Sequence, residues 1–114
     1  MTAHAFRRIA LGLDGATEGS HMGHADFRAN GRIFATLQSS ERGMVVLTPE
    51  HQAEFVAAHP SAFVPEAGAW GRQGCTRVLL KHAGAEHVGE AMTLAWQNIS
   101  TLPPKRASKP RPRR

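Results

Sequence analysis

Arginine and aromatic side chains are the residues of this sequence best suited to recognition chemistry. Arg28 and Arg32 flank an Asn-Gly pair, while Arg72 and Arg77 flank Gly74 shortly after Trp70. Guanidinium groups bind phosphates and carboxylates, and an indole face can stack on a base or another planar group. If the two segments are neighbours in the fold, these residues form one patch that binds anions or nucleic acid. The alternative is that the arginines are solvated and that Trp70 anchors a loop onto the core, which we favour for Trp70 because buried aromatics dominate small cores.

Cys75, the only cysteine, is the candidate nucleophile. A catalytic thiol needs a base close in space and a cation that lowers its pKa, and Arg72 or Arg77 could supply that charge. No motif pairs Cys75 with a base, however, and a lone cysteine at the start of a strand is more often a small packing residue. The sequence therefore predicts that this protein is not an enzyme and has no catalytic residue.

His21, His24 and Asp26 form a short cluster of side chains that are able to bind zinc or iron. Two histidines three residues apart on an extended chain point to opposite faces unless Gly23 allows a bulge. No second cluster supplies further ligands. We interpret the segment as a polar turn that leads into a hairpin, and we expect neither a metal nor another cofactor.

The positive charge of the chain is concentrated at its C-terminus. Of the 14 Lys and Arg residues, six follow Leu102 in a stretch without acids: Lys105, Arg106, Lys109, Arg111, Arg113 and Arg114. Residues 1–102 carry eight bases and nine acids, a formal net charge of −1. The tail should attract any polyanion, and it should bind duplex DNA without sequence preference because phosphate contacts carry no base information. A solubilising or incidental tail is the alternative.

Length and composition indicate one soluble domain. A chain of 114 residues can bury a core without a disulfide or a metal. The N-terminal residues have two arginines within an apolar pattern and do not form a secretory signal. The apolar clusters MVVL and VLL are too short to cross a bilayer. A single cysteine forms no internal disulfide, which suits a reducing compartment. We therefore expect a cytoplasmic protein, and we expect it to be a monomer or a weak dimer without membrane contact.

Residue patterns predict the elements that must position these side chains. Thr2 caps a first helix that Gly12 ends, Thr48 caps a second that continues to about His59, and a third covers 86–100. The second helix has four residues at core spacing: Gln52, Phe55, Val56 and His59. Strands are expected over 26–29, 32–38, 44–47, 62–66 and 75–81, with a weak one over 17–21 and a loop over 68–74.

The hairpin between 26–29 and 32–38 is the clearest local signal. Asn30-Gly31 is the preferred centre of a type I′ turn because both positions need a positive φ. Strict alternation along the second strand places Ile33, Ala35 and Leu37 on one face and Arg32, Phe34 and Thr36 on the other.

Hairpins and one-sided amphipathic helices predict an α+β fold. The predicted order is α-β-β-β-α-β-β-α, a two-layer sandwich in which helices cover one face of an antiparallel sheet. A single domain should span residues 1–102. Residues 103–114 combine proline with like charge and have no apolar periodicity, so we expect them to be disordered.

Five segments in a fixed order carry a family resemblance. They are LDGATEGSH after the first helix, HADFRANGRIFATL, VLTPEHQ, HPSAFVPEAGAWGRQGCTRVLL, and the Ala-Trp pair of the last helix. Over residues 5–100 the chain resembles the MmcQ/YjbR family of small bacterial proteins. The resemblance implies a YjbR-like or CyaY-like two-layer fold and a DNA-binding role that rests on fold analogy. Relatives commonly carry an aromatic residue at the position of Cys75, which a catalytic thiol would not permit.

The sequence as a whole predicts a non-enzymatic binding module. The leading interpretation is a DNA-binding protein in which the tail supplies nonspecific affinity and the domain supplies any specificity. The alternative is a module for a protein or a small ligand that uses the sheet face and the Trp70 loop.

Overall fold

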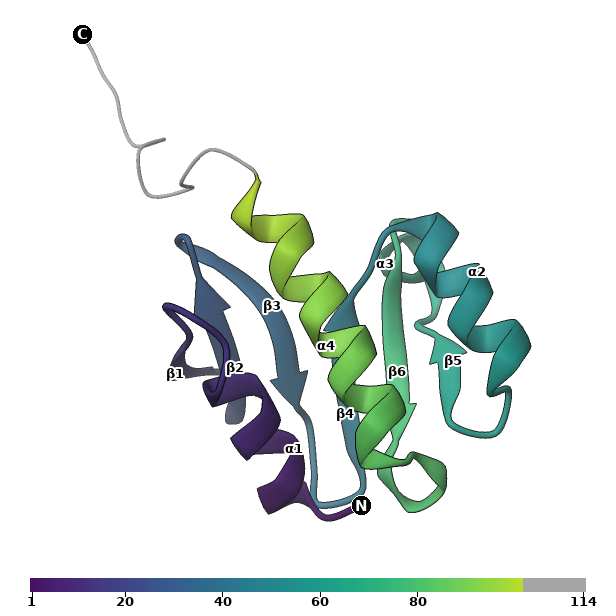
Figure 1. Cartoon of the computed structure of the whole chain (residues 1–114), viewed down its shortest axis with the longest axis horizontal. Helices are drawn as coiled ribbons and strands as arrows, with labels where there is room; N and C mark the ends of the chain where they lie inside the picture. The colour runs from purple at the N-terminus through teal and green to yellow at the C-terminus, as the bar shows by residue number, and fades with distance from the viewer. Residues whose placement is uncertain (102–114) are drawn as a thin grey trace, which may run out of the picture.

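The computed structural model describes residues 1–101, apart from the side chain of His21, and contains one antiparallel sheet. The strand order is β1-β2-β3-β4-β6-β5 (Figure 1). The strands are β1 (Thr17–His21), β2 (His24–Ala29), β3 (Arg32–Leu37), β4 (Arg42–Val46), β5 (Phe63–Pro65) and β6 (Cys75–Leu79). The weak strand predicted over 17–21 is therefore present, as the edge strand β1.

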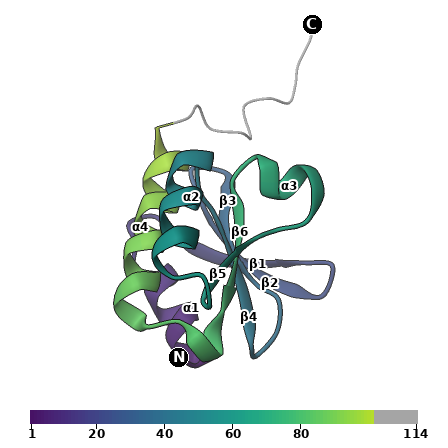
Figure 2. The same ribbon diagram turned by 90° about the vertical axis from the view of Figure 1, so that its right-hand side faces the viewer.

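Three long helices cover one face of this sheet. The helices are α1 (Ala3–Leu11), α2 (Pro49–Ala58), the short α3 (Gly68–Arg72), the 3₁₀ turn η1 (Leu80–His82) and α4 (Ala85–Ser100). Figure 2 shows α1, α2 and α4 on one side of the sheet and α3 on the other. The predicted α+β class and one-sided helical layer are thus confirmed. The prediction of a disordered tail over 103–114 concerns residues outside the described part.

Two tight turns build the three strands at one side of the sheet. Asn30 (φ 56°) and Gly31 (φ 71°) join β2 to β3, as predicted for a type I′ turn. Met22 (φ 54°) and Gly23 (φ 80°) make a second turn of the same kind between β1 and β2. His21 is consequently the backbone partner of His24 across a hairpin. The interpretation of this segment as a polar turn is therefore confirmed, and the chain reverses between the two histidines instead of continuing as one extended strand.

The pairing of β2 with β3 contains an irregularity. Phe27 pairs with Ala35 and Arg28 pairs with Ile33, so the register passes over Phe34. An extra residue in one strand breaks the alternation of side chains between faces. Phe34 and Ala35 are both fully buried as a result, and Ile33 is only half-buried. The strict alternation predicted for this strand was therefore wrong.

The core lies between the sheet and α1 and α4. Phe6 of α1 packs directly over Gly43 of β4, where an added Cβ would lie 2.7 Å from the ring. The buried stripe of α4 consists of Val88, Ala91, Met92, Ala95 and Ile99. No residue of α2 is fully buried. The four residues predicted to place α2 in the core are half-buried, so α2 covers the sheet less tightly than its pattern indicated.

Candidate binding surface

One face of the sheet is left without a layer of long helices, and we call it the open face (Figure 2). Gly43 lies against Phe6 and therefore faces the helices. Because side chains alternate along a strand, Met44 and its partner Arg77 point the other way. The same alternation and register define the open face by these residues: Asp26, Arg28, Thr36, Arg42, Met44, Val46, Val64, Cys75, Arg77 and Leu79.

A row of direct cross-strand partners runs over the open face. Asp26 pairs with Thr36, Thr36 with Met44, Met44 with Arg77, and Arg77 with Val64. With strands about 4.8 Å apart, the Cα atoms of Asp26 and Arg77 are separated by about 14 Å. The row is therefore mixed in character, with an acid and a hydroxyl on one side and a methionine and a base on the other.

Arg28 is held by a buried carboxylate rather than presented to solvent as a free cation. Its Nε donates to Asp26 Oδ1 at 2.7 Å and its Nη2 donates to Asp26 Oδ2 at 3.0 Å. The hydrogen bond and the charge of Asp26 raise the pKa of Arg28 above its ordinary value. Gly19, across the strand pair, leaves room for this contact, since a Cβ there would lie 3.0 Å from Asp26 Oδ1.

Arg77 has a carboxylate partner of its own. Its Nη2 donates to Glu66 Oε1 at 3.0 Å, and the two side chains are 31% and 15% exposed. Arg77 Nε and Glu66 Oε2 have no hydrogen-bond partner among the described residues, and neither has Thr36 Oγ1. These three atoms are fully covered by the protein itself, so they offer no contact to a molecule bound on the surface.

The four arginines predicted to form one patch are divided over two regions. The β2–β3 turn, next to Arg32, and α3, which contains Arg72, lie at opposite sides of the molecule in Figure 1. Arg28 and Arg77 share the open face, but three strand spacings separate their strands. The hypothesis of a single arginine cluster is therefore not supported by the geometry. The six tail cations, Lys105, Arg106, Lys109, Arg111, Arg113 and Arg114, lie outside the described residues.

Trp70 is an exposed side chain and not the core anchor that we favoured from the sequence. It lies in α3 and is 69% exposed. The segment predicted as a loop is a helix because contacts distant in sequence hold it. Gln52 Nε2 donates to the carbonyls of Gly71 (2.9 Å) and Cys75 (3.1 Å), and Gly71 is buried against the backbone of Glu66. These contacts hold α3 in place, and the helix exposes the Trp70 side chain to solvent.

Met22 is a second exposed apolar side chain on this side of the molecule. It is 85% exposed at the tip of the β1–β2 hairpin. Figure 2 shows that this hairpin and α3 both project to the side of the sheet that faces away from the long helices. Two of the three exposed large hydrophobic residues in the described part thus border the open face.

Cys75 lies at the edge of the open face, where it is 6% exposed. Burial raises the pKa of its thiol, and the negative charge of Glu66 raises it further. Both effects oppose formation of the thiolate, which is the reactive species. The surroundings of Cys75 are thus the reverse of those that activate a nucleophilic cysteine.

We expect iodoacetamide to alkylate native Cys75 at least about tenfold more slowly than the same residue in the urea-unfolded chain at about pH 7.5. The reason is that both the thiolate fraction and access of the reagent are lower in the fold. Since the pKa is raised, the native rate should keep increasing with pH beyond the ordinary pKa of 9.0, where the rate of the unfolded chain levels off. Mass spectrometry over time measures both rates. Equal rates for the two states at neutral pH would contradict the buried, protonated thiol.

The described residues contain no group of three histidine, cysteine or carboxylate side chains that could hold a metal ion. Asp26, the carboxylate of the predicted histidine cluster, is instead paired with Arg28. Within the same residues, no helix combines the length and the apolar character needed to cross a bilayer.

Comparison with known proteins finds a solved structure with the same fold and a family to which the sequence belongs. The crystal structure of Deinococcus radiodurans protein DR2400, which has a DUF419 domain, superimposes with a TM-score of 0.73 at 20% sequence identity, covering 88% of this chain and 79% of that chain. At this identity the similarity shows the fold. No curated protein matches the sequence. The model of the YjbR family matches residues 11–98, most of the chain, and this protein therefore belongs to the YjbR family.

Proposed function

We propose that this protein is a non-enzymatic binding module that holds a protein or peptide partner on the open face of its sheet. One observation carries the proposal: half-buried apolar side chains occupy a sheet face without long helices, beside the exposed Trp70. These side chains are Met44, Val46, Val64 and Leu79. An apolar centre bordered by an aromatic residue is the usual composition of the energetically dominant part of a protein interface.

The ion pairs of the open face favour a polypeptide partner over a phosphate. A phosphate offers acceptors alone and is bound chiefly through cations. Arg28 and Arg77 are already engaged by the carboxylates of Asp26 and Glu66. The half-buried apolar side chains at the centre of the face suit the apolar side chains of a peptide instead.

Selection of peptides from a displayed random library on the native, full-length protein tests this proposal. Trp70→Ala and Met44→Lys should each weaken the selected peptides by about tenfold or more, because an exposed aromatic and the apolar centre dominate such contacts. Trp70→Ala should leave the free energy of unfolding within about 0.5 kcal/mol of the original, since the side chain is exposed. Isothermal calorimetry and urea unfolding provide the two measurements.

Leu11→Lys is the matched control for these variants. Leu11 is 39% exposed on α1, in the helical layer, and its substitution should leave peptide affinity unchanged. Peptides that lose affinity with Leu11→Lys but not with Trp70→Ala or Met44→Lys would show that the open face is not the binding surface.

A second candidate function, nonspecific attachment to DNA, is favoured by the composition of the tail. Residues 103–114 contain six bases and no acid, whereas residues 1–102 have a net charge of −1. In this proposal the tail supplies the electrostatic attraction and the open face supplies specificity for the partner. We further propose a cytoplasmic protein that is a monomer or a weak dimer, in which the single buried cysteine needs no oxidising compartment.

A further inference from the structure

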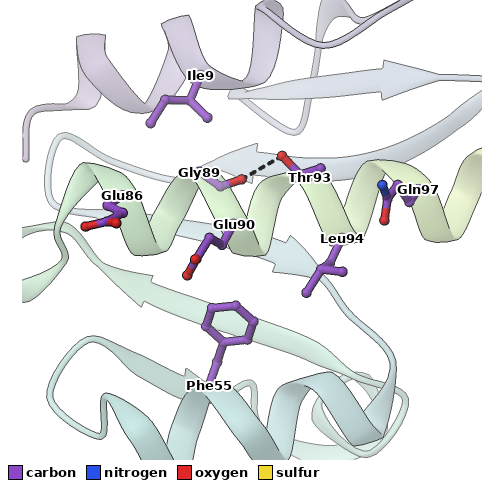
Figure 3. A pocket seen from close by; sticks show the side chains of 8 residues that line it. All are labelled: Ile9, Phe55, Glu86, Gly89, Glu90, Thr93, Leu94 and Gln97. Atoms are coloured by element: carbon purple, nitrogen blue, oxygen red, sulfur yellow. Dashed lines mark hydrogen bonds between the residues drawn. The ribbon is translucent and has the colours of Figure 1, made fainter.

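A groove with a volume of about 710 Å³ runs along the outer side of α4. Ile9 of α1 forms one wall and Phe55 of α2 points toward α4 from the other (Figure 3). The groove lies in the helical layer, on the opposite side of the molecule from the open face (Figure 2). It is also the reason why Phe55 is only half-buried.

The two ends of this groove differ in chemistry. Leu94 and Gln97 line the end nearest the C-terminus of α4, and Glu86 and Glu90 line the other end (Figure 3). The lining residues include two acids and no base. An occupant that fits is therefore a segment with an apolar part followed by cations.

We propose that the C-terminal residues 102–114 turn back along α4 and bind in this groove. Their sequence begins Leu102-Pro103-Pro104 and continues with Lys105 and Arg106. This order, apolar and then basic, matches the order in which the groove presents Leu94 and then its acids. The six cations and the absence of acids complement the charge of Glu86 and Glu90.

The length of the segment allows this arrangement. Along a helix that rises about 1.5 Å per residue, Glu90 lies about 15 Å and Glu86 about 21 Å from Ser100. Reversal of the chain takes about four residues, so the return path starts at Lys105. A proline-rich segment in the polyproline II conformation extends about 3.1 Å per residue, which brings Lys109 about 16 Å and Arg111 about 22 Å back from Ser100. Lys109 and Arg111 therefore reach the level of the two acids, and proline reduces the entropy lost on ordering.

Docking of the tail has a regulatory consequence. Cations that contact Glu86 and Glu90 are withheld from other polyanions, so the groove and an external polyanion compete for the same segment. The inference concerns the helical layer and remains valid whether or not the open face binds a polypeptide.

Paramagnetic relaxation in the full chain tests the inference. A nitroxide placed on Ser108→Cys, in a Cys75→Ala background, should broaden the amide signals of Glu86, Gly89 and Glu90 at low salt. Glu86→Gln with Glu90→Gln should reduce the docked-to-undocked ratio about fivefold, since exposed ion pairs are individually weak. The same double substitution should increase affinity for duplex DNA by a similar factor.

Glu50→Gln with Glu54→Gln, two acids of α2 outside the groove lining, is the matched control for general charge effects. This control variant should change the docked-to-undocked ratio and the DNA affinity by less than about twofold, compared with about fivefold for the groove variant. Two results would overturn the inference. One is broadening of the Arg77 amide, on the open face, as strong as that of Glu86 and Glu90. The other is broadening of the groove amides that stays the same after Glu86→Gln with Glu90→Gln. Broadening of an isotope-labelled chain by a spin-labelled second copy would likewise overturn it, by showing that the groove takes the tail of another molecule.

Discussion

Replacing Gly74 with alanine is expected to lower the free energy of unfolding by about 3 kcal/mol or more. Gly74 has a φ of +113°, a conformation that L residues rarely adopt. An added Cβ would also overlap the carbonyl oxygen of Leu47 and lie 2.8 Å from its carbonyl carbon. Neither segment can easily move away, because Leu47 N–H donates to the Gly74 carbonyl at 3.1 Å and Gly74 N–H donates to the Gly71 carbonyl at 3.0 Å.

Urea unfolding followed by circular dichroism measures this loss. Gly89→Ala is the matched control: Gly89 lies inside α4 with nothing within 4 Å of an added Cβ. That substitution should raise stability by about 0.5–1 kcal/mol, as expected when alanine replaces glycine within a helix. A Gly74→Ala protein as stable as the original would mean that β6 does not approach Leu47 as closely as the structure shows.

Gly74 also connects stability with the candidate binding surface. It lies two residues after the end of α3, and its N–H donates to the carbonyl of Gly71 in that helix. Strain at Gly74 should therefore disturb the helix that presents Trp70. We expect the Gly74→Ala protein, measured while still folded, to lose peptide affinity together with stability, whereas Trp70→Ala loses affinity alone.

Elements with strong local signals were predicted well from the sequence. Thr48 caps α2 as expected, with its Oγ1 accepting from His51 N–H at 3.1 Å. Asn30 and Gly31 adopt the positive φ values that a type I′ turn needs. In both cases a few neighbouring residues determine the conformation, so the sequence contains the full information.

Features that depend on distant contacts were not predicted. The helix α3 is held by Gln52, about twenty residues earlier in the chain, and no pattern within 68–74 shows that contact. Trp70 was assigned to the core because of its type, although its place on α3 exposes it. Phe34 is buried because the β2–β3 register shifts beside it, and register irregularities have no single-residue signature.

The ion pairs of the candidate site illustrate the same division. Asp26 and Arg28 are two residues apart on one strand, a spacing that places both side chains on the same face, so their pairing was available from the sequence. Glu66 and Arg77 belong to different segments and meet only because β5 pairs with β6. Arginines were therefore overrated as anion contacts wherever a carboxylate partner was not considered.

The full chain is expected to bind duplex DNA with a logarithmic salt slope of about −5, which corresponds to an affinity about 10³-fold weaker at 200 mM than at 50 mM salt. The six cations that follow Leu102 are the cause, since each one that neutralises a phosphate releases a condensed counterion. Sequence should matter little, because such contacts carry no base information. Fluorescence anisotropy with two unrelated duplexes over a range of salt concentrations measures both the slope and the specificity.

A full-length variant in which the six tail bases are replaced with glutamine should lose this binding and its salt slope. Arg8→Gln with Arg42→Gln removes two exposed cations from the folded part and is the matched control, expected to leave the slope nearly unchanged. If the tail variant kept the slope and the control lost it, DNA binding would belong to the folded domain, through Arg8 and Arg42. If the slope disappears with the tail, the open face remains available for a polypeptide while the tail is attached to DNA, because the two surfaces use different residues.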